Sequence, residues 1–198
     1  MHKEEGLSFR NVIIFNLYEY YPLTADAINS NLNALKEMFL DHVDIDKQNI
    51  FSPDGTIPKD TIFEYCRLYE QRIESFGGLD AVLLGIGRVG NIGFNEPGES
   101  FEKTTHCVQL TQSTIDANHR LFDEGEAVPE KAFTMGIKSI MQSKHILLIA
   151  NGEKKAQIIR DAFFGPVTPK VPASILQLHN NVTVIVDKEA GKLIKDVL

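Results

Sequence analysis

The chain has 198 residues, of which 43% are hydrophobic, and its formal net charge is −7 at pH 7. This length supports a folded domain with a substantial core, and the negative charge argues against nucleic acid or an anionic membrane as a partner. Apolar runs fall short of the ~20 residues that cross a bilayer, and the two distant cysteines match neither a disulfide framework nor a zinc site. We therefore expect a cytoplasmic protein with one domain over residues 1–198, no metal and no cofactor.

Short apolar runs alternate along the chain with stretches in which apolar residues recur every three to four positions. This alternation is typical of an α/β fold with a mainly parallel sheet and helices on both faces. The predicted strands are 12–15, 81–84, 107–110, 146–150 and 182–186. The predicted helices are 25–41 with a Thr24 cap, 59–76 ending at Gly77-Gly78, 114–122, 137–142, 154–163 and 173–178.

The loop after the strand at 81–84 contains Gly85, Gly87 and Gly90. Glycine can adopt positive φ and lets a ligand approach the backbone, whose N–H groups then suit a phosphate. The same spacing also fits a tight strand-to-helix connection without a ligand, so both interpretations stay open. The next residues, Gly93-Phe94-Asn95-Glu96-Pro97, place an amide beside a carboxylate on a segment stiffened by proline. Ligands of open α/β sheets bind at the carboxyl ends of strands, which makes this loop the predicted site.

This loop resembles the signature loop of the glucosamine-6-phosphate deaminase/isomerase family more than that of the related 6-phosphogluconolactonases. Further segments resemble the family in the same order along the chain: 15–20, 39–45, 117–122, 152–156 and 172–179. The resemblance therefore covers nearly the whole chain. It implies a Rossmann-like fold and a family reaction in which glucosamine 6-phosphate is isomerised from aldose to ketose with hydrolytic loss of ammonia.

The resemblance also implies that three titrating groups of the family are substituted here. Tyr18 stands where the family has a proton-shuttling aspartate, Asn91 where it has a ring-opening histidine, and Val89 where it has that histidine's aspartate partner. A phenol with an ordinary pKa of ~10 is a poor base at neutral pH, and an amide cannot take up and return a proton. Glu96 alone remains of the family's catalytic carboxylates, which favours impaired or absent catalysis.

Glu19 is the second candidate catalytic carboxylate, because it lies next to the substituted Tyr18. Adjacent residues of a strand point to opposite sides, so Glu19 would face away from a ligand unless the loop twists. The alternative is a structural or solvated carboxylate. Tyr18 itself would either pack at the rim of the sheet or stack on a sugar ring or hydrogen-bond to it.

Arg120 and Lys155 match the family's phosphate-binding residues. The planar guanidinium of arginine can hold two phosphate oxygens, and Lys155 lies near the start of a predicted helix whose N-terminal N–H groups favour an anion. The alternative for each is a solvated surface cation. Arg88 adds a cation to the glycine loop, which together with Asn91 and Asn95 completes the predicted ligand loop. The expected partner is a small anionic sugar phosphate.

In the family, a strand and a phosphate-binding loop precede the segment that Met1-His2-Lys3 resembles. A fold that lacks this strand and its helix would expose apolar sheet surface, which another subunit of a homo-oligomer, a rearranged fold or a longer chain would cover. Three functions remain open: a sugar-phosphate enzyme, a non-catalytic sugar-phosphate-binding regulatory subunit, and a structural module of a larger chain or assembly. His179 is expected to be a hydrogen-bonded structural residue.

Overall fold

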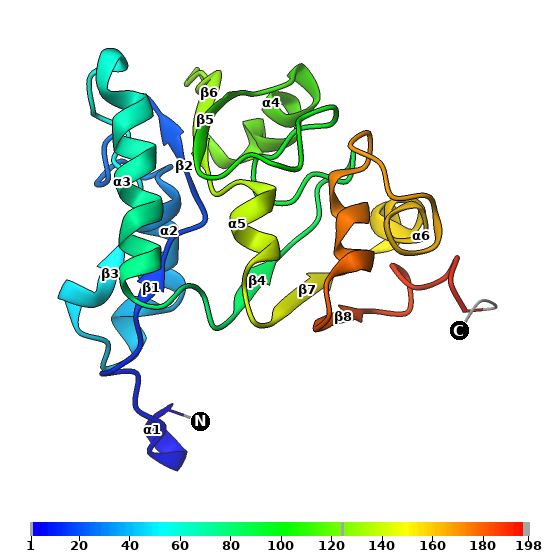
Figure 1. Ribbon diagram of the computed structural model, residues 1–198, viewed down its shortest axis with the longest axis horizontal. Helices are drawn as coiled ribbons and strands as arrows, with labels where there is room; N and C mark the ends of the chain where they lie inside the picture. The colour runs from blue at the N-terminus through cyan, green and yellow to red at the C-terminus, as the bar shows by residue number, and fades with distance from the viewer. Residues whose placement is uncertain (1, 124, 196–198) are drawn as a thin grey trace. The chain divides into compact units, whose positions relative to one another are not determined.

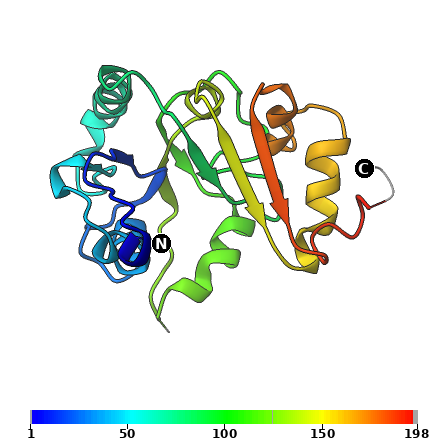
Figure 2. The same ribbon diagram turned by 90° about the horizontal axis from the view of Figure 1, so that it is seen from below.

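The computed structural model describes residues 2–123 and 125–195 as two compact units (Figures 1 and 2). Unit 1 consists of Met1–Ile62 and Gln109–Phe133, and unit 2 consists of Phe63–Val108 and Thr134–Leu198. Each unit is therefore assembled from two separate stretches of sequence. That residues 1–198 form a single domain stays a prediction from the sequence.

Unit 1 is built from short strands and helices around aromatic side chains. Its strands are β1 (Ile14–Phe15), which pairs in parallel with β3 (Ile50–Phe51), and β2 (Tyr18–Tyr21), which neighbours β6 (Lys131–Thr134). Its helices are α1 (His2–Glu5), α2 (Asn31–Met38), η1 (Leu40–His42), η2 (Lys47–Asn49), η3 (Lys59–Thr61), α4 (Gln112–Asn118) and η4 (His119–Leu121). Phe15 stacks on Phe51 across β1 and β3, with ring centroids 4.9 Å apart. Aromatic contacts thus hold together strands too short to pair extensively.

The predictions for unit 1 were partly wrong. The helix expected over 25–41 begins only at Asn31, because the residues from Thr24 onwards form turns and Ser30, not Thr24, is the N-cap. Only Ile14–Phe15 of the strand expected over 12–15 forms, and the strands β2, β3 and β6 were not predicted. β2 reads Tyr-Glu-Tyr-Tyr and lacks the apolar run that identifies a buried strand, although three of its four side chains are buried.

Unit 2 contains a parallel sheet in the order β4-β7-β8 (Figure 2). The strands are β4 (Val82–Leu84), β7 (Ile146–Ala150) and β8 (Val182–Val186). The helices that begin or lie in this unit are α3 (Ile62–Ser75), α5 (Ile137–Met141), η5 (Glu153–Lys155), α6 (Ala156–Phe164) and η6 (Pro172–Leu178), with α6 packed against η6. β5 (His106–Gln109) leads from unit 2 to unit 1. The predicted α/β fold with parallel strands and helices is confirmed, and the bounds predicted for β7 and β8 match the structure.

The helix over 59–76 is also confirmed as η3 followed by α3. Cys66, Tyr69 and Ile73 occupy its buried face at the predicted spacing. Gly77 and Gly78 have φ of 84° and 85°, a conformation that ends a helix at little cost only for glycine.

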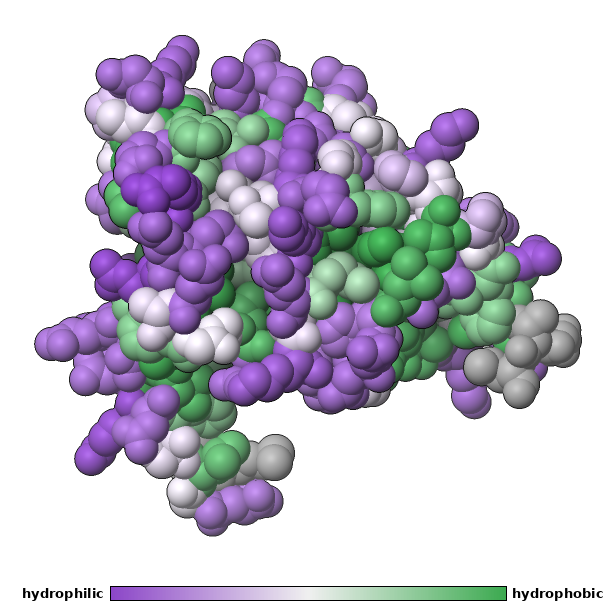
Figure 3. Space-filling model, viewed as in Figure 1, coloured by the Kyte–Doolittle hydropathy of each residue, from purple (hydrophilic) through white to green (hydrophobic). Residues whose placement is uncertain are grey.

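The two faces of the unit 2 sheet differ in exposure. One face is buried and belongs to the core, with Val82, Leu84, Ile146 and Leu148 among its side chains. The other face carries Leu83, Ile149 and Ile185, which are 66%, 45% and 51% exposed, and the register places Ile149 beside Ile185. Parallel sheets are normally covered on both faces, whereas these three apolar side chains are largely exposed. Hydrophobic side chains also gather over η6 in Figure 3.

Candidate functional site

The glycine loop, residues 85–97, begins directly after β4 and is held by hydrogen bonds within unit 2. Inside the loop, the N–H of Gly87 donates to the carbonyl of Asn91 at 2.8 Å, and the N–H of Gly90 donates to the carbonyl of Gly87 at 3.2 Å. The carbonyl of Gly90 accepts a hydrogen bond from the N–H of Ala173 at 2.8 Å. The loop is thus a defined turn fastened to the start of η6.

The glycines of this loop serve different purposes from those expected. Gly90 has the predicted positive φ, at 84°, and a Cβ there would lie 2.8 Å from Cγ1 of Val171. Gly85 and Gly87 do not have positive φ, so that prediction was wrong for them; Gly87 is small because a Cβ would lie 1.7 Å from Oδ1 of Asn91. The N–H groups of Gly87 and Gly90 are already used within the loop. They therefore shape the turn and are not the donors that a phosphate would meet.

Asn91 stands where the resemblance implies a histidine in the family, and its side-chain amide is hydrogen-bonded. Nδ2 of Asn91 donates to the carbonyl of Gly93 at 3.2 Å, and the side chain packs against Gly87. Val89 is half-buried and Arg88 is exposed to solvent. The side-chain amide of Asn91 thus stabilises the turn by a hydrogen bond.

The end of the glycine loop is buried. The N–H of Phe94 donates to Oγ1 of Thr134 at 3.1 Å, and Nδ2 of Asn95 donates to the carbonyls of Ile92 and Met135 at 2.8 and 2.9 Å. Nδ2 of Asn95 is therefore held by one carbonyl inside the loop and one directly after β6. The ligand contact expected for Asn95 stays a prediction. Glu96, the remaining candidate catalytic carboxylate, is only 3% exposed.

Lys155 joins the glycine loop to the segment after β7. Its side-chain Nζ donates a hydrogen bond to the carbonyl of Ile86 in the loop, 69 residues earlier in the chain. Its own N–H donates to the carbonyl of Gly152 at 3.0 Å, where η5 begins. The ammonium group is thus held against the glycine loop, and its function in binding phosphate stays a prediction.

In unit 1, the carboxylate of Glu19 is 1% exposed and caps the start of α2. Its oxygens accept hydrogen bonds from Ser30 Oγ at 2.8 Å, from the N–H of Asn31 and Leu32 at 3.0 and 2.9 Å, from Asn31 Nδ2 at 3.3 Å and from the N–H of Tyr20 at 2.9 Å. A carboxylate with five donors is committed to structure. The geometry therefore favours the structural alternative for Glu19 over a replacement base.

Tyr18 lies on β2 and Arg120 on η4, both in unit 1. Burial, and secondarily the neighbouring Glu19 carboxylate, raise the pKa of the Tyr18 phenol above its ordinary value of 10.0. The phenol therefore stays neutral at physiological pH and can donate a hydrogen bond but not accept a proton as a base. Arg120 is exposed at the end of α4, where an anion could reach its guanidinium.

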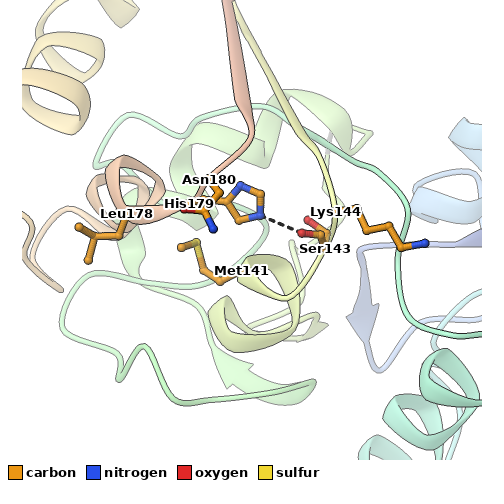
Figure 4. A pocket seen from close by; sticks show the side chains of 6 residues that line it. All are labelled: Met141, Ser143, Lys144, Leu178, His179 and Asn180. Carbon is orange, nitrogen blue, oxygen red and sulfur yellow. Dashed lines mark hydrogen bonds between the residues drawn. The ribbon is translucent and has the colours of Figure 1, made fainter.

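A separate pocket of about 310 Å³ lies near the amino ends of β7 and β8, and hence at the opposite end of these strands from the glycine loop (Figure 4). His179 lines it and is locked in one tautomer: Nε2 donates to the carbonyl of Ser143 at 2.8 Å, and Nδ1 accepts from the N–H of Asn181 at 3.1 Å. The other lining residues are Met141, Ser143, Lys144, Leu178 and Asn180. This hydrogen-bonding pattern agrees with the structural function expected of His179.

Within residues 2–123 and 125–195, no group of three or more His, Cys, Asp or Glu side chains is arranged to hold a metal ion, and no helix has both the length and the hydropathy of a membrane span. Two contributors to the unit 2 loops were missed from the sequence. The first is Gly152, which has φ of 85° and begins the turn that contains Lys155. The second is Asp187, whose carboxylate accepts a hydrogen bond from the N–H of Gly152. The available signal was an aspartate directly after the apolar run of β8.

The parallel strands and the loop at the carboxyl end of β4 define an α/β protein of Rossmann-like layering with a candidate anion-binding loop. Residues 2–185 match the family of glucosamine-6-phosphate isomerases and 6-phosphogluconolactonases, and the chain belongs to this family. A solved monomeric glucosamine-6-phosphate deaminase superimposes with a TM-score of 0.93 at 45% identity, covering 97% of this chain and 79% of that one. The family expected from the motifs is thus confirmed.

Two sequence relatives show how far the match extends. A glucosamine-6-phosphate deaminase-like protein of Bacteroides thetaiotaomicron is 63% identical over 191 residues, which are 96% of this chain and 29% of that protein. A glucosamine-6-phosphate deaminase of Thermoanaerobacter sp. is 49% identical over 196 residues, which are 99% of this chain and 77% of that protein. The chain thus spans less than a third of the Bacteroides relative. Its own oligomeric state stays a prediction.

Proposed function

We propose that this chain binds a phosphorylated amino sugar of the glucosamine 6-phosphate class at its glycine loop and turns it over poorly or not at all. The observation that carries the proposal is the hydrogen bond from Lys155 Nζ to the carbonyl of Ile86, which holds a cation against the loop. Relatives of this chain are named glucosamine-6-phosphate deaminases, which supports the ligand class. The match of Arg120 to a phosphate-binding arginine of the family stays a prediction from the sequence resemblance alone.

Poor catalysis follows from the chemistry of the substituted positions. The Tyr18 phenol, with its raised pKa, cannot take a proton from carbon at neutral pH, and the Asn91 amide neither gains nor loses a proton in that range. General acid–base groups contribute roughly 10²- to 10⁴-fold each to an enzymatic rate. Glu96 is buried at the end of the loop, where it would act without the two partners that the family provides.

Binding is tested by thermal unfolding with glucosamine 6-phosphate and its N-acetyl form. Ligand at ten times its Kd stabilises the folded state by about 1.4 kcal/mol, which corresponds to about 3–6 °C for a chain of this length. Lys155→Ala and Arg120→Ala should each reduce this shift, whereas Lys154→Ala, which removes an exposed neighbouring lysine, should not. No shift at millimolar ligand would contradict the proposed binding and favour a structural module.

Catalysis is tested by measuring ammonia release from glucosamine 6-phosphate. We expect at most a trace from the native sequence, and release at an ordinary enzyme rate would contradict impaired catalysis. The triple variant Tyr18→Asp, Val89→Asp and Asn91→His restores the titrating groups that the resemblance assigns to these positions. Its ammonia release should exceed that of the native sequence. Equal release from a folded triple variant would show that these three positions do not account for the loss.

A further inference from the structure

Asp187 links the ends of two neighbouring strands of unit 2. It follows β8 directly, and the register pairs Ala150 at the end of β7 with Val186 at the end of β8. Both carboxylate oxygens of Asp187 accept from the N–H of Gly152, at 3.1 and 3.0 Å, and one of them also accepts from the N–H of Ala190 at 2.7 Å. Although the residue is exposed, its carboxylate is therefore fixed by two backbone donors.

The hydrogen bonds continue from Gly152 to the glycine loop. Gly152 has φ of 85° and is the residue at which η5 begins. Its carbonyl accepts from the N–H of Lys155 at 3.0 Å, and Lys155 Nζ donates to the carbonyl of Ile86. Asp187 thus stands at one end of a chain of hydrogen bonds that has the lysine ammonium group and the glycine loop at the other.

The carboxylate is suited to hold this turn. The first N–H groups of a helix have no partner within the helix, and a carboxylate that accepts from them fixes where the helix begins. η5 runs directly into α6, so the backbone direction at Gly152 sets the direction in which the side chain of Lys155 leaves the helix. A side-chain ion pair between Glu153 and Lys192 joins the same two segments without involving the backbone of Gly152.

We propose that Asp187 is a positioning residue for the phosphate-binding lysine: by holding the N–H of Gly152, it keeps the ammonium group of Lys155 against the glycine loop where a sugar phosphate would bind. This inference rests on the proposed function, and it adds a residue that touches neither the ligand nor the glycine loop. Asp187 would act on affinity through Lys155 alone. That dependence makes the inference separable from a general effect on folding.

The test is a double-mutant cycle measured by calorimetric titration with glucosamine 6-phosphate. Asp187→Ala should weaken binding about tenfold, in line with the loss of partners that orient metal ligands in other proteins. Lys192→Ala is the matched control, because it breaks only the ion pair with Glu153, and it should leave the affinity unchanged. In a Lys155→Ala background, Asp187→Ala should have no further effect on affinity, because the residue it positions is gone. Asp187→Asn keeps one oxygen acceptor and should restore part of the affinity if the alanine variant folds poorly.

The outcomes separate the two proposals. If the native chain binds and Asp187→Ala binds equally well, the positioning function is wrong while the proposed function stands. If Asp187→Ala weakens binding equally with and without Lys155, the residue acts elsewhere and the inference is also overturned. If the native chain does not bind glucosamine 6-phosphate, the proposed function fails, and the positioning function fails with it.

Discussion

Replacing Glu19 by alanine separates its two interpretations, because a structural carboxylate and a replacement base respond differently. The Glu19 side chain is 1% exposed in the folded state and accepts five hydrogen bonds. The substitution leaves these five donors without this acceptor. The Ser30 hydroxyl can rotate towards another acceptor. The backbone N–H groups of Tyr20, Asn31 and Leu32 cannot.

The expected cost follows from these three backbone donors. Each buried donor left without a partner costs about 1–3 kcal/mol, and the donors at the start of α2 are partly reached by water. We expect Glu19→Ala to lower the free energy of unfolding by about 3–5 kcal/mol, a large share of the roughly 5–15 kcal/mol of a typical domain. Glu19→Gln keeps the shape and one acceptor oxygen but turns an amide donor towards N–H groups, so it should cost about half as much.

The measurement is urea unfolding at pH 7, followed by circular dichroism, with the slope m checked for constancy. Glu37→Ala is the control, because Glu37 is exposed on the same helix and its one side-chain bond, to Asn33, is 3.3 Å long; its cost should stay within about 0.5 kcal/mol. A Glu19→Ala variant within 1 kcal/mol of the native sequence would refute the capping argument. If the native sequence released ammonia from glucosamine 6-phosphate and a folded Glu19→Ala variant did not, the carboxylate would have to be reconsidered as a base.

Three further predictions concern the glycine loop, a buried histidine and two buried tyrosines. Gly90→Ala should lower the melting temperature, because φ of 84° and the 2.8 Å approach to Val171 both oppose a side chain. Gly85→Ala is the control and should be nearly neutral, since open space surrounds that position and its φ is not positive. Equal melting temperatures for the two variants would contradict the loop geometry. Burial lowers the pKa of His106 below its ordinary 6.5, so the unfolded chain binds this proton more readily than the folded chain as pH falls through that value. The free energy of unfolding should therefore decrease at acidic pH, and His106→Gln should reduce this decrease in urea unfolding. Burial raises the pKa of the Tyr20 and Tyr69 phenols above 10.0, so unfolding should become easier as pH rises past that value, and a flat stability profile up to pH 11 would contradict this assignment.

Local patterns were sufficient where a strand or helix is defined by its own residues. β7 is a continuous apolar run, β8 is apolar except for Thr183, and α3 repeats its buried residues every three to four positions before Gly77 and Gly78, so these elements could be predicted from sequence. β2 and β6 were missed because three of the four residues in each are buried by packing in the folded chain and show no distinctive pattern. The start of α2 was misplaced because its cap includes a carboxylate from β2, which no local signal reveals.

Residue type and order were enough to predict the family and the α/β class. Through the resemblance they also predict that Tyr18, Val89 and Asn91 stand where the family has titrating groups. Only the tertiary structure decided what other side chains do. Glu19 became a helix cap through donors 11 to 13 residues away, Lys155 reached the glycine loop across 69 residues, and Asp187 met Gly152 across 35. Such contacts depend on which strands lie side by side, and a periodicity of two or 3.6 residues contains no information about partners at that distance.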